Sequence, residues 1–335
     1  MSISAPPASD RDLVVRLNMD VAPGGMALLS PGGAMRWGRC LFDLNPPPGG
    51  RADFAVVLAN ARPYDRFVCA PQNTLFIAGE PLEKKLYAPG FYRQFGHVLD
   101  THPMSRHPGL ILGAPGLNWH VGLDMRSRTY RFGYDYLKAL TRPPKENRIA
   151  VVCSSANFTQ GQRHRLALLD YLKQRLGDRL VHFGRGFQPI DDKMDAILPY
   201  RYQLVLENTC AENYWTEKLA DAYLGWAYPV YLGCPNLDAF FSPDAYCAID
   251  GGDFAVAGDR IERLLERPES ETEIAAVAES RHRVLDIYNP LAWAAHWAET
   301  LYRPAPESEV WIRIHKAFRP FPRGLIYRMR QALAG

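Results

Sequence analysis

The sequence lacks any apolar run long enough to cross a membrane. A spanning helix needs about 18 or more consecutive, mostly apolar residues, and no segment of the chain approaches that length. The opening segment MSISAPPASDRD also lacks the basic region and apolar core of a secretory signal. We therefore expect a cytoplasmic protein.

Paired cysteines are missing as well. The six cysteines include no C-x-x-C pair, the spacing typical of zinc sites and redox motifs. Several lie inside apolar segments, such as Cys153 in IAVVCSS and Cys247 in AYCAI. This pattern predicts free, buried thiols in a reducing compartment rather than disulfides or zinc ligands.

The familiar phosphate-binding motifs are absent too. The chain contains no G-x-x-x-x-G-K-[ST] and no G-x-G-x-x-G, which excludes a standard P-loop and a standard dinucleotide fingerprint. Its only D-x-D is formed by Asp10 and Asp12, close to the first residue. We therefore predict no bound metal and no cofactor.

What is present is the composition of a soluble globular protein. Hydrophobic residues make up 47% of the chain and charged residues 22%, and the net charge is only +3. The charge alone predicts neither nucleic acid nor a membrane as a partner. At 335 residues the chain is long enough for two domains.

The two halves of the chain are patterned differently. Residues 1–141 contain apolar segments suited to strands, such as LVVRLNM, CLFDL and TLFIAGE, separated by many Pro and Gly residues. The segment TRPPKEN, residues 141–147, marks a predicted domain boundary. From 148 to 302, predicted strands and helices alternate, which indicates a parallel sheet covered on both faces, an α/β fold.

The elements predicted for the second half are well separated. We predict strands over residues 147–155, 180–184, 202–209, 228–233 and 245–250, and helices over 162–177, 191–199 and 216–226, with two more between 270 and 302.

Residues 303–335 form a basic, aromatic tail. From Val310 onward it contains basic and aromatic residues but no acidic one, and Pro320 and Pro322 predict a break between two short helical pieces. Three interpretations stay open: a helix packed on the domains, an anchor on the inner leaflet of a membrane, or a nucleic-acid contact. The last is the weakest, because nothing else in the chain supports it.

A lysine near the start of a predicted helix is the most informative local feature. Thr216 is suited to cap that helix, and Glu217 suits its first turn. Lys218 does not, because a cation at a helix start costs roughly 0.3–1 kcal/mol. Arg163 and Arg165 lie in the same way at the start of the helix after CSSAN.

These cations lie where an α/β sheet binds its ligands. Ligands bind outside the carboxyl ends of parallel strands, where loops lead into helix starts. An anion between the two helix starts, most simply a diphosphate, would explain all three cations. The simpler alternative is that these long side chains extend into water.

The segment YRYQLVLENTCAENYWTEKLADAYLGWAYPVYLG, residues 200–233, resembles the signature of glycosyltransferase family 10, the α-1,3/α-1,4-fucosyltransferases. The matching residues are Tyr200, Tyr202, Glu207, Asn208, Tyr214, Thr216, Glu217, Lys218, Pro229 and Gly233. The resemblance is specific over residues 148–255. It implies an α/β protein of GT-B architecture, with two Rossmann-like domains facing each other across a cleft, the first (residues 1–141) binding the acceptor and the second (residues 148–302) the GDP-sugar.

The resemblance also assigns roles to residues of the second domain. Arg165 and Lys218 are expected to hold the diphosphate of a GDP-sugar donor, and Asn208, Tyr214 and Glu217 to contact the rest of the donor. Four further residues are weaker candidates for the same site: Arg163, Glu207, Thr216 and His120.

The family's general base is a glutamate of the first domain. Glu80, in the G-E-P turn of TLFIAGEPLEKK, matches that position, while Glu83 lies three residues further on. We predict Glu80 as the base, against the alternative that it is an ordinary glutamate of a surface turn.

The implied activity is inverting transfer of L-fucose from GDP-β-L-fucose to a hydroxyl of an oligosaccharide or glycolipid acceptor, such as a lipopolysaccharide. Leu206 and Trp215 depart from the family pattern and leave open another GDP- or UDP-linked sugar. A catalytically silent protein that binds a sugar nucleotide or a glycan is the second alternative.

Overall fold

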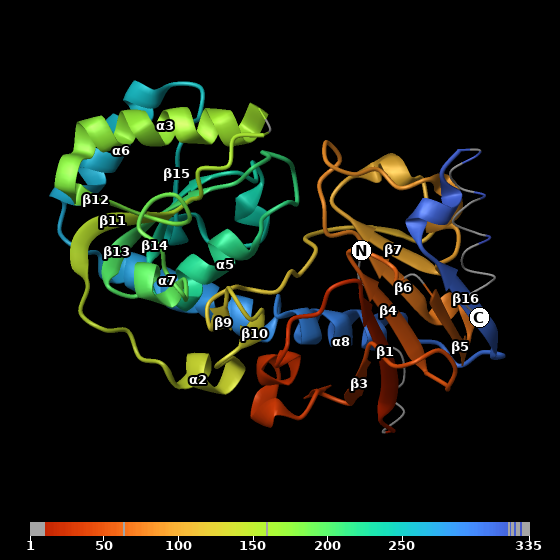
Figure 1. Ribbon diagram of the computed structural model, residues 1–335. Helices are drawn as coiled ribbons and strands as arrows, with labels where there is room; N and C mark the ends of the chain where they lie inside the picture. Colours follow the sequence, from red (N-terminus) through yellow and green to blue (C-terminus); the bar gives the residue numbers. More distant parts are fainter. Residues whose placement is uncertain are drawn as a thin grey trace. The chain divides into compact units, whose positions relative to one another are not determined.

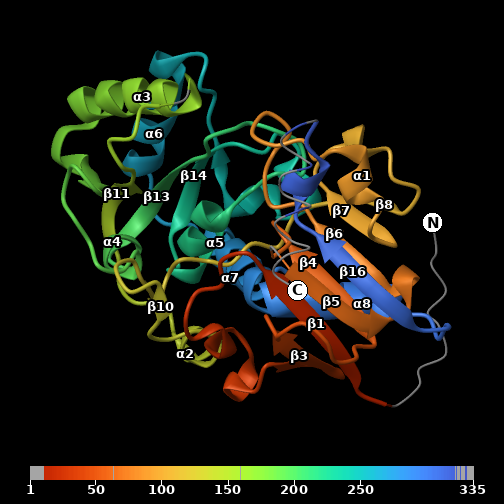
Figure 2. The same cartoon turned by 45° about the vertical axis from the view of Figure 1, so that its right-hand side comes forward.

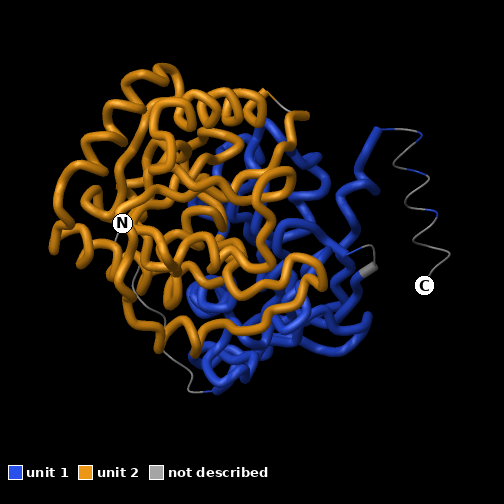
Figure 3. Tube along the Cα trace, turned by 60° about the vertical axis from the view of Figure 1, so that its left-hand side comes forward, with its two compact units in different colours: residues 1–115, 290–335 blue, residues 116–289 orange. Residues whose placement is uncertain are grey.

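The computed structural model describes residues 11–62, 64–158, 160–320, 322, 325 and 329. The chain divides into two compact units (Figure 3). The first unit combines residues 1–115 with residues 290–335, and the second comprises residues 116–289.

The first unit is built on a seven-stranded sheet with the order β2-β3-β1-β4-β6-β7-β8. Its pairings are parallel except that of β2 with β3. The central segments LVVRLNM and FAVVL are largely apolar because parallel strands are buried on both faces. The strands are β1 Leu13–Met19, β2 Arg36–Trp37, β3 Cys40–Leu44, β4 Phe54–Leu58, β6 Thr74–Ile77, β7 His97–Asp100 and β8 Leu110–Leu112.

A two-stranded antiparallel sheet completes this unit (Figure 2). It pairs β5, Tyr64–Cys69, with β16, Ser308–Arg313. Ile312 of β16 is fully buried in a cluster centred on Phe76 and the aromatic side chains around α1, Pro89–Tyr92. A strand from the far end of the chain therefore contributes to the core of this unit.

The predicted domain boundary at residues 141–147 is wrong. The second unit begins at residue 116, because the segment before β11 bonds to it: Trp226 Nε1 donates to Leu140 O at 3.0 Å, and His120 N donates to Asp221 Oδ1 at 2.6 Å. The chain returns to the first unit at α8, Pro290–Leu301, whose alanine-rich face packs on β2, β3 and β4.

The predicted separate tail, residues 303–335, is also wrong in its described part. Ser308–Arg313 is a strand rather than a helix, because alternate side chains, Val310 and Ile312, are apolar and buried. A short 3₁₀ helix follows at His315–Phe318. Arg323, Arg328 and Arg330 lie outside the described residues.

The second unit is the α/β sheet that the sequence predicts. All five strands are parallel, in the order β12-β11-β13-β14-β15, with α3 and α6 on one face and α4, α5 and α7 on the other (Figures 1 and 2). Its strands are β11 Glu146–Val152, β12 Leu180–Phe183, β13 Tyr200–Leu206, β14 Tyr228–Leu232 and β15 Cys247–Ala248; its main helices are α3 Gln160–Leu176, α4 Met194–Ile197, α5 Glu217–Leu224, α6 Phe254–Glu266 and α7 Glu271–Asp286. Smaller elements are β9 Leu123–Asp124, β10 Thr129–Tyr130 and α2 Tyr134–Ala139.

Every strand predicted for this unit is present, but helix α6 was not predicted. Its start is marked by Asp253, whose Oδ1 accepts hydrogen bonds from Ala255 N and Val256 N, the usual pattern of an N-cap. The exposed alanine and valine of its first turn obscured the helical periodicity.

Five of the six cysteines are buried thiols, as predicted, whereas Cys210 is exposed. Across the described part of the chain, no helix has both the length and the apolar character needed to span a bilayer.

Replacing Ile312 with Ala should lower the free energy of unfolding by about 2–5 kcal/mol, because it opens a cavity in the core of the first unit. The matched change Trp311→Ala, at a neighbour that is 41% exposed, should cost less than about 1 kcal/mol. Urea denaturation of both variants measures the difference. Equal losses would contradict the assignment of β16 to the core.

Candidate donor-binding site

The predicted donor residues gather at the carboxyl edge of the second unit's sheet. The chain leaves β11 toward β12 on one side and then crosses to β13 on the other, so β11 and β13 flank a topological switch point. Open α/β sheets bind ligands at such a point. A pocket of about 550 Å³ lies here, a size typical of small-molecule sites.

This donor pocket is lined by side chains from three elements. It includes Arg163 and Arg165 of α3, Glu207 and Asn208 after β13, and Leu232 at the end of β14. The start of α3 approaches the loop after β13 so closely that a Cβ on Gly161 would lie 2.3 Å from Asn208 O. Glycine is therefore required where α3 meets this loop.

Lys218 is held beside the pocket by a buried carboxylate. Its Nζ lies 3.2 Å from Glu207 Oε2, 3.0 Å from Thr216 Oγ1 and 3.3 Å from Glu217 Oε1. Glu207 is buried, and its Oε1 also accepts hydrogen bonds from Thr216 N at 2.9 Å and Thr216 Oγ1 at 2.8 Å. The side chain of Thr216 caps α5 by accepting from Lys218 N, as predicted.

The three ionisable groups shift one another's pKa values. Burial raises the pKa of Glu207. Burial alone would lower the pKa of Lys218, but Glu207 and Glu217 outweigh it and hold that pKa above its usual range. Burial would likewise raise the pKa of Glu217, yet Lys218, Lys193 and His120 hold it well below its usual range. Lys218 is therefore a fixed cation.

This arrangement explains why a lysine stands at a helix start. The sequence alone suggested an external anion, whereas the structure provides an internal one, because Glu207 lies within ion-pair distance of Lys218. Without Lys218, the carboxylate of Glu207 would be buried with no cation against it, which is costly.

A second group of charges continues from Glu217 along α5. Glu217 Oε1 lies 3.9 Å from both Lys193 Nζ and His120 Nδ1. Lys193 Nζ donates to Asp221 Oδ2 at 2.7 Å, and Asp221 Oδ1 accepts from His120 N and Val121 N. His120, a weaker candidate from the sequence, therefore does lie beside the donor residues.

Lys193 and Asp221 were not predicted. Asp221 could have been found, since it stands four residues after Glu217 on one face of a helix. Lys193 could not, because it comes from the crossover before β13 and only the folded chain brings it to α5. The nearby Asp192 lies one residue before Lys193, the N-cap of the short helix α4, and accepts from Met194 N at 2.9 Å.

The two arginines of α3 have different surroundings. Arg165 is buried and its Nη1 donates to Asn208 Oδ1 at 2.8 Å, while its Nε has no hydrogen-bond partner among the described residues. Arg163 donates to the carbonyl oxygens of Asn157 and Phe158, 3.2 Å away in both cases. The structure thus brings Arg165, Asn208 and Glu207 to one pocket, with Lys218 bound to Glu207.

The two departures from the family pattern are buried. Trp215 packs edge-on against Phe241 and Tyr288, with ring centroids 5.1 Å apart in both pairs. The ring of Trp215 therefore lies in an aromatic core. Leu206 and Tyr214 are also buried, at the end of β13 and just before α5 respectively.

Glu80, the predicted base, belongs to the first unit. It follows β6 and is partly buried, and its Oε1 accepts a hydrogen bond from Lys84 Nζ at 2.7 Å. Glu83, the alternative, is exposed in the same loop. The side chain of Glu80 is 30% exposed, and its role as the general base stays a prediction.

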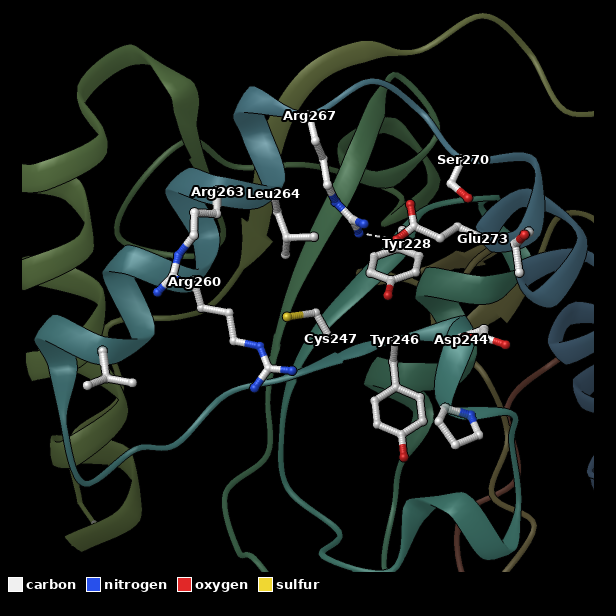
Figure 4. Close-up of a pocket in the computed structure, with 13 residues that line it drawn as sticks. Tyr228, Asp244, Tyr246, Cys247, Arg260, Arg263, Leu264, Arg267, Ser270 and Glu273 are labelled. Atoms are coloured by element: carbon white, nitrogen blue, oxygen red, sulfur yellow. Dashed lines mark hydrogen bonds and ion pairs between the residues drawn. The ribbon is translucent and has the colours of Figure 1, made fainter.

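A larger pocket, of about 710 Å³, lies at the opposite edge of the same sheet (Figure 4). Tyr228 and Cys247, the first residues of β14 and β15, line it, so it lies at the amino ends of the strands. Among its arginines, Arg267 is already paired with Glu273. The pocket contains none of the predicted donor residues.

The region that contains the donor pocket is similar to known proteins. Residues 143–282 match the model of the C-terminal region of glycosyltransferase family 10 (fucosyltransferase). The chain is 33% identical over 76 residues to the α-(1,3)-fucosyltransferase FucT of Helicobacter pylori, a match that covers 22% of this chain and 16% of that protein. It is 31% identical over 134 residues to a human 4-galactosyl-N-acetylglucosaminide 3-α-L-fucosyltransferase, covering 38% of this chain and 30% of the relative. The matches thus span less than a third of either relative.

The fold is similar over nearly the whole chain. A solved structure of an α1,3-fucosyltransferase with GDP superimposes with a TM-score of 0.50 at 15% identity, over 91% of this chain and 96% of that one. At 15% identity the structural likeness shows the fold alone. The shared fold confirms the predicted GT-B class. The region that matches this family model, residues 143–282, contains Glu207, Asn208 and Lys218.

Proposed function

We propose that this protein transfers L-fucose from GDP-β-L-fucose to a hydroxyl group of a glycan, with inversion at the anomeric carbon. The observation that carries the proposal is the fixed ammonium of Lys218, held by Glu207 beside a pocket lined by Arg165. A cation that is positioned before the reaction stabilises charge as it develops, without reorganising at that moment. The solved relative with GDP supports a GDP-linked donor.

In the proposed reaction the acceptor oxygen attacks the anomeric carbon of fucose. The bond from that carbon to the β-phosphate oxygen breaks, and its electron pair leaves with GDP. Glu80 accepts the proton of the acceptor hydroxyl, and attack from the opposite face converts the β-linked donor into an α-linked product. Arg165 and Lys218 stabilise the departing diphosphate, while Asn208, Tyr214 and Glu217 contact the donor.

The partners follow from the same proposal. The donor is a GDP-sugar and the acceptor an oligosaccharide or glycolipid, and we propose that the protein works in the cytoplasm. Trp311 is 41% exposed on β16, with the Arg313 guanidinium 4.6 Å from its ring centroid. This face is suited to an anionic membrane surface, where each basic residue contributes about 1 kcal/mol.

GDP binding tests the role of Lys218. Because Lys218→Met alone would leave Glu207 uncompensated, the comparison is between Glu207→Gln and the double variant Glu207→Gln/Lys218→Met, which differ only in the lysine. Calorimetric titration should show GDP bound by the first and at least about tenfold more weakly by the second, the cost of a hydrogen bond to a charged group. UDP should bind more weakly than GDP to both. Equal GDP affinities would contradict the donor site.

Glu80→Gln should lower kcat by about 100-fold or more, because a general base contributes 10²–10⁴ in rate. GDP affinity should stay unchanged in the same variant. Glu83→Gln, three residues away and exposed, is the matched control and should leave kcat unaltered. Loss of transfer in the control, with Glu80→Gln active, would assign the base to Glu83.

Transfer should be insensitive to EDTA, since the arginine and lysine side chains provide the positive charge that a metal would otherwise supply. Initial rates with and without the chelator are the measurement. A loss of activity that Mg²⁺ or Mn²⁺ restores would show that a metal takes part.

A further inference from the structure

The first unit has a topological switch point of its own. The chain leaves β1 toward β3 on one side and crosses to β4 on the other, so ligands are expected between the carboxyl ends of β1 and β4. Asp20 directly follows β1, and Asn60 lies two residues after β4. The loop after β6, the neighbour of β4, provides Lys85.

These three side chains form a hydrogen-bonded chain, which we call the switch-point triad. Lys85 Nζ donates to Asn60 Oδ1 at 2.5 Å, and Asn60 Nδ2 donates to Asp20 Oδ2 at 3.3 Å. The orientation of the Asn60 amide is thus fixed from both sides. Lys85 Nζ also lies 4.3 Å from the ring centroid of Tyr87, a cation–π contact that orients the ammonium.

The backbone before Asn60 is strained. Ala59 has φ = 63°, a left-handed conformation that is uncommon for a residue with a Cβ. The turn is held by Tyr87 Oη, which donates to Ala59 O at 2.5 Å, and by Ala59 N, which donates to Ile77 O at 2.8 Å. Strain of this kind persists where the surroundings enforce it, and it is concentrated at ligand sites.

The triad lies on the same loop system as the proposed base. Glu80 and Lys85 both follow β6, and the charges of Glu80 and Asp20 act on Lys85. The chain therefore places a carboxylate, an amide and an ammonium next to the group that would take the acceptor's proton.

We propose that the switch-point triad of Asp20, Asn60 and Lys85 binds the acceptor, a pyranose with two adjacent hydroxyl groups. Asp20 accepts a hydrogen bond from one hydroxyl, while the Asn60 amide and the Lys85 ammonium donate to the other. Few, fixed polar groups of this kind orient a ligand in a binding site. The inference deepens the proposed function and rests on it.

The charge of Lys85 gives the triad a pH dependence. Burial lowers the pKa of Lys85 to about 8, Glu80 and Asp20 oppose that shift, and Lys316 and Lys84 add to it. His315 faces the same Tyr87 ring, 5.7 Å away, and Lys85 contributes to its lowered pKa. Because its folded-state pKa is lowered, Lys85 is an ammonium below about pH 8 and loses its charge above it.

Acceptor kinetics test the inference, with the best acceptor found in a panel of galactosyl and N-acetylglucosaminyl oligosaccharides. Lys85→Met and Asn60→Ala should raise the acceptor KM at least tenfold, with kcat at saturating acceptor within about threefold and GDP affinity unchanged. Above pH 8 the acceptor KM should rise in the unaltered protein but not in Lys85→Met.

Lys173→Met is the matched control, because Lys173 Nζ lies 4.2 Å from the Phe187 ring centroid, the same cation–π geometry in the other unit. Lys173→Met should change neither the acceptor KM nor kcat. An unaltered acceptor KM in both triad variants, with transfer intact, would overturn the inference alone. No transfer by the unaltered protein from any acceptor of the panel would instead overturn the proposed function, and the inference with it.

Discussion

The ion pair between Glu207 and Lys218 is the interaction on which the site depends. It joins the end of β13 to the start of α5, and Thr216 contributes both its backbone N–H and its hydroxyl to the same carboxylate. A buried carboxylate needs a cation and hydrogen bonds, and here one turn of helix supplies them all. Because the buried carboxylate of Glu207 needs a cation, the ammonium of Lys218 is held at the edge of the sheet where an anion would bind.

Each unit repeats one arrangement around its own switch point. In the second unit, Arg165 and Asn208 meet between the ends of β11 and β13. In the first, Asp20 and Asn60 meet between the ends of β1 and β4. Both sheets reverse strand order at these points, so connections diverge and leave the strand ends uncovered. A sheet topology that appears twice thus accounts for two polar clusters with different chemistry, cationic in one unit and mixed in the other.

Much of the second unit could be predicted from sequence, because its strands and helices alternate and carry local signals. Thr216 as a cap and the strand before Glu207 follow from neighbouring residues alone. The partner of Lys218 could not be identified that way, since a carboxylate eleven residues earlier in the chain reaches it only after folding. The signature placed Glu207 among the weaker candidates, and the structure shows it at the centre of the site.

The first unit was less predictable for a physical reason. Its core depends on contacts between distant segments, such as β16 with β5 and α8 with β2, β3 and β4. A proline pair near residue 143 suggested a boundary, but prolines mark a turn and carry no information about which unit the flanking segments join. Because Ile312 is buried in the core of the first unit, β16 belongs to that unit.

A crystal structure of the protein with GDP would test the central claim most directly. The account predicts diphosphate oxygens within about 3 Å of Lys218 Nζ and of the Arg165 guanidinium, the distance of a charge-assisted hydrogen bond. A diphosphate bound instead among Arg260, Arg263 and Arg267 at the opposite edge of the sheet, with Lys218 still bound only to its carboxylates, would contradict it.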